Sequence, residues 1–197
     1  MAVGIAFITS VIVVTIVDDF LLANFVVPGD TEKLANDIAT IGKMFVFAVV
    51  GYLFVLVLDI IVGLALYVVL MPANKNLALL TSILRLTYAL ILIIGVFALL
   101  FEMIDAYGYA SLKLVGYIFF ALHIFILGYS VFKSGYMPKS LGLLLMLASF
   151  TYIIFFVDFN LSEAFMVVIM IIMAVAELAL SIWLMIKRNT LPRIKQS

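Results

Sequence analysis

Apolar residues fill stretches of this chain that are as long as a membrane-spanning helix, and no other feature limits the fold as strongly. Such stretches occur at residues 2–24, 41–70, 77–101, 112–133, 140–157 and 163–186. About 20 apolar residues in a helix cross the roughly 30 Å hydrocarbon core of a bilayer, whereas strands of a membrane barrel would alternate apolar and polar residues. With 68% hydrophobic and only 11% charged residues, the chain is too apolar for a water-soluble globule. We therefore predict an all-α integral membrane bundle of six transmembrane helices, in one domain that covers residues 1–197.

The second stretch is longer than a membrane requires, so we expect it to tilt or to extend into the interface. The segment "VPGDTEKLANDIAT" at residues 27–40 precedes it and is predicted to be an outer loop. The first stretch has neither a basic start nor a cleavage site of small residues. We therefore expect a retained helix there rather than a signal peptide.

Lysine and arginine residues gather in the loops that would lie on one side of the membrane. These loops and the C-terminal segment carry Lys75, Lys133, Lys139, Lys187, Arg188, Arg193 and Lys195. The opposite side carries most of the acidic residues, namely Asp30, Glu32, Asp37, Glu102, Asp105, Asp158 and Glu163. Because cytoplasmic loops hold an excess of lysine and arginine, we expect both termini in the cytoplasm.

Four ionisable side chains remain inside the apolar stretches, namely Asp59, Arg85, His123 and Glu177. Three of them each lie ten residues from a lysine at the predicted cytoplasmic end of their helix, and Asp59 lies slightly deeper. This separation corresponds to about 15 Å, which places all four near the middle of the membrane. A charge at that depth costs about 2.5–3.5 kcal/mol when it faces lipid, so we expect the four side chains to face one another.

Small and polar residues recur on the same helix faces as these four groups. Around His123, for example, Gly116 and Ser130 lie at seven-residue intervals. Interfaces between membrane helices favour such residues, because they allow close approach and hydrogen bonding. We expect a supporting polar shell formed by Tyr88, Ser130, Ser149, Tyr152 and Ser181. We also expect an acidic outer mouth formed by Glu102 and Asp105.

The charges of the four groups do not balance when the histidine is neutral, because two carboxylates face one guanidinium. A site of low dielectric penalises this imbalance, so we expect an extra proton on His123 or shared among the carboxylates. For Arg85, a structural ion pair and the recognition of an anion both stay open. For His123, the alternatives are a neutral ring bonded across helices, proton transfer and metal ligation.

Several classes of function lack support in the sequence. The absence of cysteine excludes disulfides, thiolate metal sites and cysteine nucleophiles. The net charge of zero argues against a nucleic-acid partner. A metal ion held by His123 and the two carboxylates would be repelled by Arg85, so we expect no metal and no other cofactor. No nucleophile elbow, zinc-protease motif or P-loop occurs, so we expect no enzymatic activity while keeping it open.

Three blocks of sequence carry a resemblance to a known family. The blocks at residues 59–91, 122–153 and 176–187 contain the four ionisable side chains, with Pro72 and Pro138 in the turns. Together they resemble the domain-of-unknown-function family DUF4386 of prokaryotic multi-pass membrane proteins. The resemblance covers the second to the sixth helix. It implies a six-helix protein of the bacterial or archaeal cytoplasmic membrane, no established activity, and a site at these four side chains.

Our leading hypothesis is a membrane protein that binds or transports a small solute or ion at these four side chains, with proton coupling. Arg85 would hold an anionic group or the carboxylates, and His123 would exchange the proton. The expected partners are the lipid bilayer and a small solute, ion or lipid. One alternative is a structural or partner-binding membrane protein whose polar groups only fix helix packing. Another is an intramembrane enzyme that acts on a lipid-like substrate, with His123 and a carboxylate as acid and base.

Overall fold

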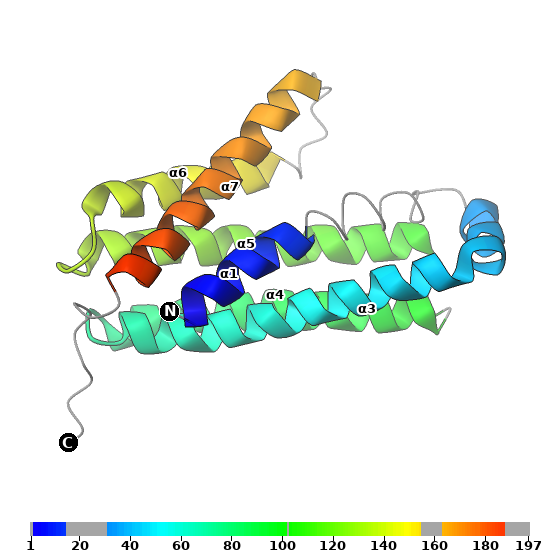
Figure 1. Cartoon of the computed structure of the whole chain (residues 1–197), viewed down its shortest axis with the longest axis horizontal. Coiled ribbons are helices and arrows are strands. Elements are labelled where there is room, and N and C mark those ends of the chain that lie inside the picture. The colour runs from blue at the N-terminus through cyan, green and yellow to red at the C-terminus, as the bar shows by residue number, and fades with distance from the viewer. Residues whose placement is uncertain (1, 15–30, 102, 155–162, 188–197) are drawn as a thin grey trace.

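A computed structural model of the chain describes residues 2–14, 31–101, 103–154 and 163–187 (Figure 1). The regular elements in these ranges are all helices, as predicted, namely α1 (Ala2–Val14), α3 (Thr31–Leu70), α4 (Lys75–Leu100), α5 (Ala106–Lys133), α6 (Lys139–Ile154) and α7 (Glu163–Ile186). Four stretches are long and apolar enough to span a membrane: Val49–Leu70, Lys75–Leu100, Tyr107–Lys133 and Val167–Ile186. The described chain is therefore a helical membrane protein.

The first and fifth of the six expected spans stay predictions. The described part of the first is α1, which has 13 residues, and residues 15–24 of the predicted helix lie outside the described residues. α6 has 16 residues, which is short of the roughly 20 that a bilayer requires. Residues 155–157 of this predicted span also lie outside the described part of the chain.

The helix α3 begins earlier than the sequence suggested, so the prediction of a loop is wrong for residues 31–40. These residues contain neither proline nor glycine, and Leu34, Ile38 and Ile41 recur at the spacing of one helix face. The 40 residues of α3 make a helix of about 60 Å, about twice the thickness of the hydrocarbon core. Figure 1 shows its first turns, in blue, beyond the ends of α4 and α5. This part of α3 extends past the membrane-spanning part of the bundle.

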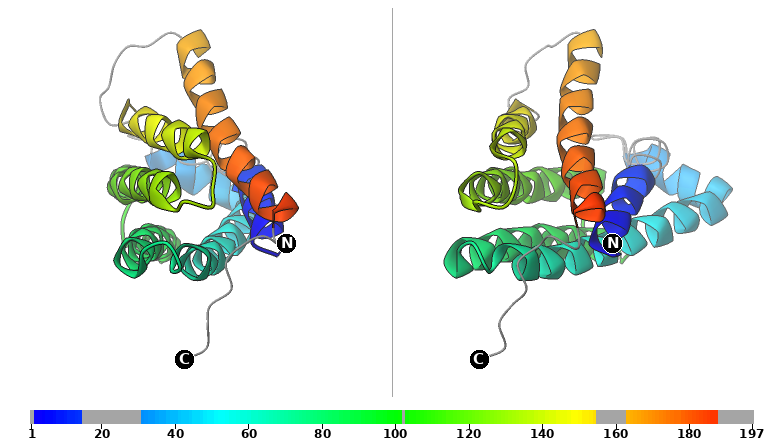
Figure 2. Two further views of the ribbon diagram at one scale, coloured as in Figure 1. Left: turned by 90° about the vertical axis from the view of Figure 1, so that its left-hand side faces the viewer. Right: turned by 60° about the vertical axis from the view of Figure 1, so that its left-hand side comes forward.

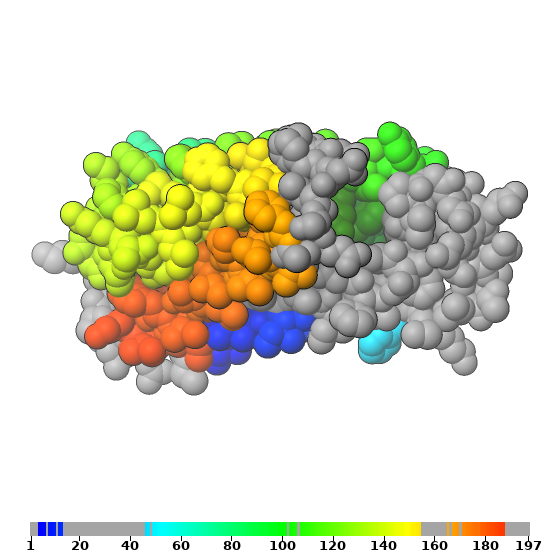
Figure 3. Space-filling model, turned by 90° about the horizontal axis from the view of Figure 1, so that it is seen from above, coloured from blue at the N-terminus to red at the C-terminus, as the bar shows by residue number. Residues whose placement is uncertain are grey.

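The helices form a ring in which each one packs against its neighbours. α5 packs against α4 and α6, α3 packs against α4 and α1, and α7 packs against α6 and α1. The contact between α1 and α7 closes the ring, as the view along the bundle in Figure 2 shows. Figure 3 shows the face on which α6, α7 and α1 lie side by side. A closed ring gives every helix one face toward a shared interior.

The outer face of this ring is apolar. Every spanning stretch carries half-exposed aliphatic side chains, such as Ile61, Ile83, Ile118 and Ile171. Buried polar residues lie on the opposite faces of the same helices. This arrangement, with apolar groups outside and polar groups inside, suits a protein whose surroundings are hydrocarbon rather than water.

Two tight turns lie at the same end of the bundle, to the left in Figure 1. In the turn between α3 and α4, the side chain of Asn74 caps α4 by accepting a hydrogen bond of 3.0 Å from the Leu77 N–H. In the turn between α5 and α6, Gly135 has a φ of +75°, which favours glycine. The Tyr136 hydroxyl donates a hydrogen bond of 2.6 Å to the carbonyl of Val69 and so links the two turns.

Both ends of the described chain also lie toward this end of the bundle, which is bordered by Lys75, Lys133, Lys139 and Lys187 (Figure 1). Four of the seven basic residues predicted for the cytoplasmic side thus lie at one end of the bundle, and Arg188, Arg193 and Lys195 lie outside the described residues. Which side of a membrane this end faces stays a prediction.

The contact between α5 and α6 depends on two facing glycines. A Cβ on Gly128 would lie 2.7 Å from the carbonyl oxygen of Gly142, and a Cβ on Gly142 would lie 2.7 Å from the carbonyl oxygen of Gly128. Both distances are too short for a real side chain, and backbone atoms cannot move aside easily. The glycines therefore set how closely these helices approach, as small residues do in membrane bundles.

Candidate functional site

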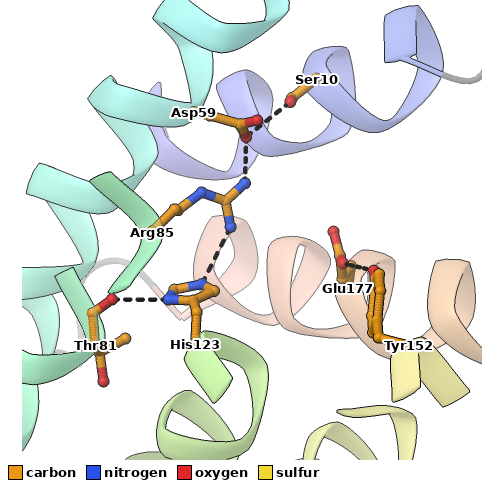
Figure 4. Close-up of polar contacts among 7 residues, drawn as sticks. All are labelled: Ser10, Asp59, Thr81, Arg85, His123, Tyr152 and Glu177. Carbon is orange, nitrogen blue, oxygen red and sulfur yellow. Dashed lines mark hydrogen bonds and ion pairs between the residues drawn. The ribbon is translucent and has the colours of Figure 1, made fainter. Parts of the chain in front are cut away.

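Each helix of the ring contributes a polar side chain to the shared interior (Figure 4). The residues involved are Ser10 on α1, Asp59 on α3, Thr81 and Arg85 on α4, His123 on α5, Tyr152 on α6 and Glu177 on α7. The four ionisable side chains singled out in the sequence are all among them, and none is more than 6% exposed. The structure thus brings together four groups that lie far apart in the sequence.

Arg85 is the centre of the first group of contacts, which we call the arginine network. Its Nη2 donates to Oδ1 of Asp59 in a buried ion pair, and its Nη1 lies 3.2 Å from Nε2 of His123. The Ser10 hydroxyl donates to the same oxygen of Asp59 at 3.1 Å. The aliphatic part of Arg85 lies against Gly63, where a Cβ would be 3.6 Å from Cβ and Cδ of the arginine. Three helices are thus joined through one guanidinium.

The contacts of His123 determine which ring nitrogen carries its proton. The Nη1 group of Arg85 can only donate, so Nε2 of His123 must accept. The carbonyl oxygen of Thr81 lies 2.8 Å from Nδ1 and can only accept, so Nδ1 must donate. Both requirements are met by a neutral imidazole with its proton on Nδ1. Of the two expected places for an extra proton, this arrangement favours the carboxylates over His123.

Glu177 and Tyr152 form a second group, which we call the tyrosine–glutamate pair. The Tyr152 hydroxyl donates a hydrogen bond of 2.6 Å to Oε1 of Glu177. Both side chains are buried, with exposed fractions of 7% and 6%. The pair joins α6 to α7 and lies apart from the arginine network, to the right in Figure 4.

Phe120 contacts members of both groups. The guanidinium carbon of Arg85 lies 5.3 Å from the centre of its ring, within the range of a cation–π interaction. The ring centres of His123 and Tyr152 lie 5.7 Å and 5.0 Å from that of Phe120. Tyr88 also packs against Phe120, with ring centres 4.6 Å apart. The predicted cluster therefore consists of two polar groups that share an aromatic neighbour.

The residues of the predicted polar shell are all buried, but they have different contacts. Tyr152 binds Glu177, and Tyr88 reaches the site through its packing on Phe120. The three serines donate instead to carbonyl groups of their own helices, with bonds from Ser130 to Ile126, from Ser149 to Met146 and from Ser181 to Glu177. Serine in a membrane helix can satisfy its hydroxyl in this way, which spacing alone does not reveal.

The predicted outer mouth is only partly described. Glu102 lies outside the described residues. Asp105 is exposed and caps α5, because its Oδ1 accepts a hydrogen bond of 2.7 Å from the Gly108 N–H. This contact accounts for an acidic residue at that position without a ligand.

Metal ligation is one of the alternatives left open for His123. Within the described residues, no group of three or more histidine, aspartate or glutamate side chains is placed to hold a metal ion. Asp59 and His123 instead both contact the guanidinium of Arg85.

Two residues of the site were missed in the sequence. Ser10 lies in an apolar helix beside Thr9. The hydroxyl of a serine there can donate a hydrogen bond either to another helix or to its own backbone, and the sequence does not distinguish the two. Phe120 lies three residues before His123, on the same helix face. That spacing could have identified it as a neighbour of the site.

Comparison with known proteins gives the family of the chain. The sequence model of the family described as a domain of unknown function, DUF4386, matches residues 2–187. A protein of Archaeoglobus fulgidus described as uncharacterised is 42% identical over 112 residues, which make up 57% of this chain and 67% of the relative. No solved structure matches. Because the family match covers nearly all of the chain, including the four ionisable residues of the interior, the protein belongs to the DUF4386 family.

Proposed function

We propose that this protein binds a small solute or ion at its interior polar groups and carries it across the membrane together with a proton. The setting would be the cytoplasmic membrane of a prokaryote, with the lysine-rich end of the bundle inside. The ligand class follows from the chemistry of the interior, whose described polar groups are a few charged and hydroxyl side chains.

The observation that carries this proposal is the charge of the buried site. Asp59 and Arg85 compensate each other, and His123 is neutral in its observed contacts. Glu177 adds a carboxyl group without adding a second cation. Ionisable groups inside membrane helices are costly and mark pathways for ions or protons more often than other positions do.

The proposal can be tested in liposomes that contain the purified protein and a trapped pH-sensitive dye. An inward gradient of Na⁺, K⁺ or acetate is applied in separate runs, and the internal pH is followed. We expect at least one gradient to drive proton movement several-fold faster than in empty liposomes, and we expect Glu177→Gln to abolish the difference. Ile83→Met, on the lipid-facing side of α4, is the matched control. Rates equal to those of empty liposomes with all three probes would contradict the proposal.

A structural role is the second candidate, and the arginine network favours it. The contacts from Arg85 to Asp59 and His123 connect α3, α4 and α5 through atoms that are almost completely buried. Buried ion pairs of this kind can specify helix packing without any ligand. In that case, charge-neutral variants would lower stability and leave every liposome measurement unchanged.

A further inference from the structure

We propose that the tyrosine–glutamate pair is the proton-binding site of the protein, with the proton held on the carboxyl group of Glu177, whereas the arginine network is a fixed structural anchor. This inference rests on the proposed function, because it assigns the proton of that function to one residue. It also differs from the expectation that His123 exchanges the proton.

The first argument comes from the distribution of charge. Arg85 and Asp59 form an ion pair, so the arginine network carries no net charge when His123 is neutral. An ionised Glu177 would then leave one negative charge on a side chain that is only 6% exposed. A buried carboxylate without a cation of its own is strongly unfavourable. One proton on Glu177 restores neutrality and leaves all described contacts in place.

The second argument comes from the geometry of the carboxyl group. Oε1 accepts the hydrogen bond of 2.6 Å from Tyr152, so a proton on Glu177 belongs on Oε2. Such a carboxyl group would accept at one oxygen and carry its proton at the other. Tyr152 acts as a positioning residue here, because it fixes the orientation of Glu177 and stabilises the carboxylate that forms when the proton leaves.

The third argument concerns the other groups that face Glu177. α7 packs against α6, which contributes Tyr152, and against α1, whose described residues include no titratable side chain. From further across the ring, Arg85 attracts a carboxylate at Glu177 and Asp59 repels it. The attraction by Arg85 is the stronger of the two, so it offsets part of the cost of burying the Glu177 carboxylate. Tyrosine neighbours of the pair, Tyr88 and Tyr117, are neutral groups at ordinary pH.

The two groups also differ in how they are held. The arginine network has four polar contacts, including that from Ser10 on α1 and that to the backbone of α4. The tyrosine–glutamate pair is joined by the single bond between Tyr152 and Glu177. A group that exchanges protons must lose and regain a contact during its cycle, and the pair can do so without separating an ion pair.

The test is labelling of the full-length protein with dicyclohexylcarbodiimide, followed by mass spectrometry of its peptides. A protonated carboxyl group adds across a carbon–nitrogen double bond of the reagent, and the adduct rearranges to a stable N-acylurea without loss of atoms. We expect the label on Glu177, several-fold above any label on Asp59, and a yield that falls as the pH rises. The double variant Arg85→Met/Asp59→Asn removes the ion pair without leaving a charge, so it should keep the label on Glu177, whereas Glu177→Gln should remove it.

Tyr152→Phe separates the positioning role from a purely structural one. Without the hydroxyl, the carboxylate form of Glu177 loses its hydrogen bond, so labelling should persist to higher pH than in the wild type. A structural role alone would change the stability and leave the pH profile of labelling in place. Circular dichroism and gel filtration of each variant establish that the compared proteins are folded.

Infrared difference spectra provide a second measurement that does not depend on access of the reagent. The band of a protonated carboxyl group should be present in the wild type and in the double variant Arg85→Met/Asp59→Asn, and absent in Glu177→Gln. A band that disappears in this double variant, or a label mainly on Asp59 in the wild type, would overturn the inference. Proton flux with an ionised Glu177 would overturn this site and leave the carrier proposal intact. A protonated Glu177 without any proton flux would contradict the carrier proposal and leave the assignment of the proton to Glu177 intact.

Discussion

Replacement of Arg85 by methionine tests the arginine network most directly. Methionine has a similar length and no charge, so the variant removes the ion pair to Asp59 and the contact to Nε2 of His123 while it largely keeps the packing against Gly63. Asp59, 4% exposed, would be left with the hydrogen bond from Ser10 and no cation. Removal of one partner of a buried ion pair costs about 3–5 kcal/mol. We expect Arg85→Met to lower the free energy of unfolding by this amount.

The second half of the test is the double variant with Asp59→Asn. Asparagine keeps an oxygen that can accept from Ser10, but it carries no charge that needs a cation. The double variant should therefore be more stable than Arg85→Met alone, by roughly 0.5–3 kcal/mol, which is the range of coupling found between residues in contact. An independent loss at each position would instead make the double variant the least stable of the set.

Unfolding can be followed by titration of sodium dodecyl sulfate into mixed micelles, with the helical circular dichroism and the fluorescence of Trp183 as signals. Trp183 is the only tryptophan of the chain and lies on α7, away from the substituted helices. Ile83→Met introduces the same side chain on the exposed face of α4 and controls for methionine itself. The reasoning is refuted if Arg85→Met is no less stable than Ile83→Met, or if Asp59→Asn does not rescue it.

Three further predictions concern the helix contacts and the turns. Gly128→Ala should cost about 1–3 kcal/mol, measured by the same titration, because its Cβ would lie 2.7 Å from the backbone of Gly142; an unchanged midpoint would mean that the two helices separate freely. Tyr136→Phe should cost about 1 kcal/mol through loss of the bond to Val69. Burial raises the pKa of Tyr136, so its neutral form stabilises the fold below about pH 10, and this contribution is lost as the pH rises further. The difference in the free energy of unfolding between wild type and Tyr136→Phe should therefore shrink in alkaline titrations. A constant difference would contradict the assignment. Asp105→Ala should cost about 1 kcal/mol through loss of the cap on α5. Asp105→Asn should change neither the stability nor the liposome flux, since asparagine can cap α5 as aspartate does. A change of flux in Asp105→Asn would support the outer mouth instead.

Much of the interior could be predicted because lipid allows so few alternatives. A charge in hydrocarbon is so costly that Asp59, Arg85, His123 and Glu177 had to point inward, and all four are buried. Seven-residue spacing on α5 likewise identified an inward face, since Gly116 and Ser130 are buried with His123. These predictions follow from the solvent and the helix period, and they need no knowledge of which helices are neighbours.

The pairing of the interior groups could not be predicted in the same way. Depth along a helix is read from residue counts, but the order of helices around the ring is not. For this reason the sequence left Arg85 free to pair with Asp59 or with Glu177, and the structure shows the ion pair with Asp59. The start of α3 was misjudged for a different reason, because a polar helix that extends past the membrane has the composition of a loop.

The structural and the carrier interpretations need not compete for the same residues. The arginine network has matched charges and several contacts, so a neutral substitution there changes stability first. The tyrosine–glutamate pair has one hydrogen bond and a carboxyl group without a cation of its own in the described contacts, so a neutral glutamine at Glu177 mimics the protonated state. Glu177→Gln should therefore unfold at nearly the same denaturant concentration as the wild type, while Arg85→Met should not. A large loss of stability in Glu177→Gln would mean that the carboxylate itself holds the ring together, and the division between anchor and proton site would have to be abandoned.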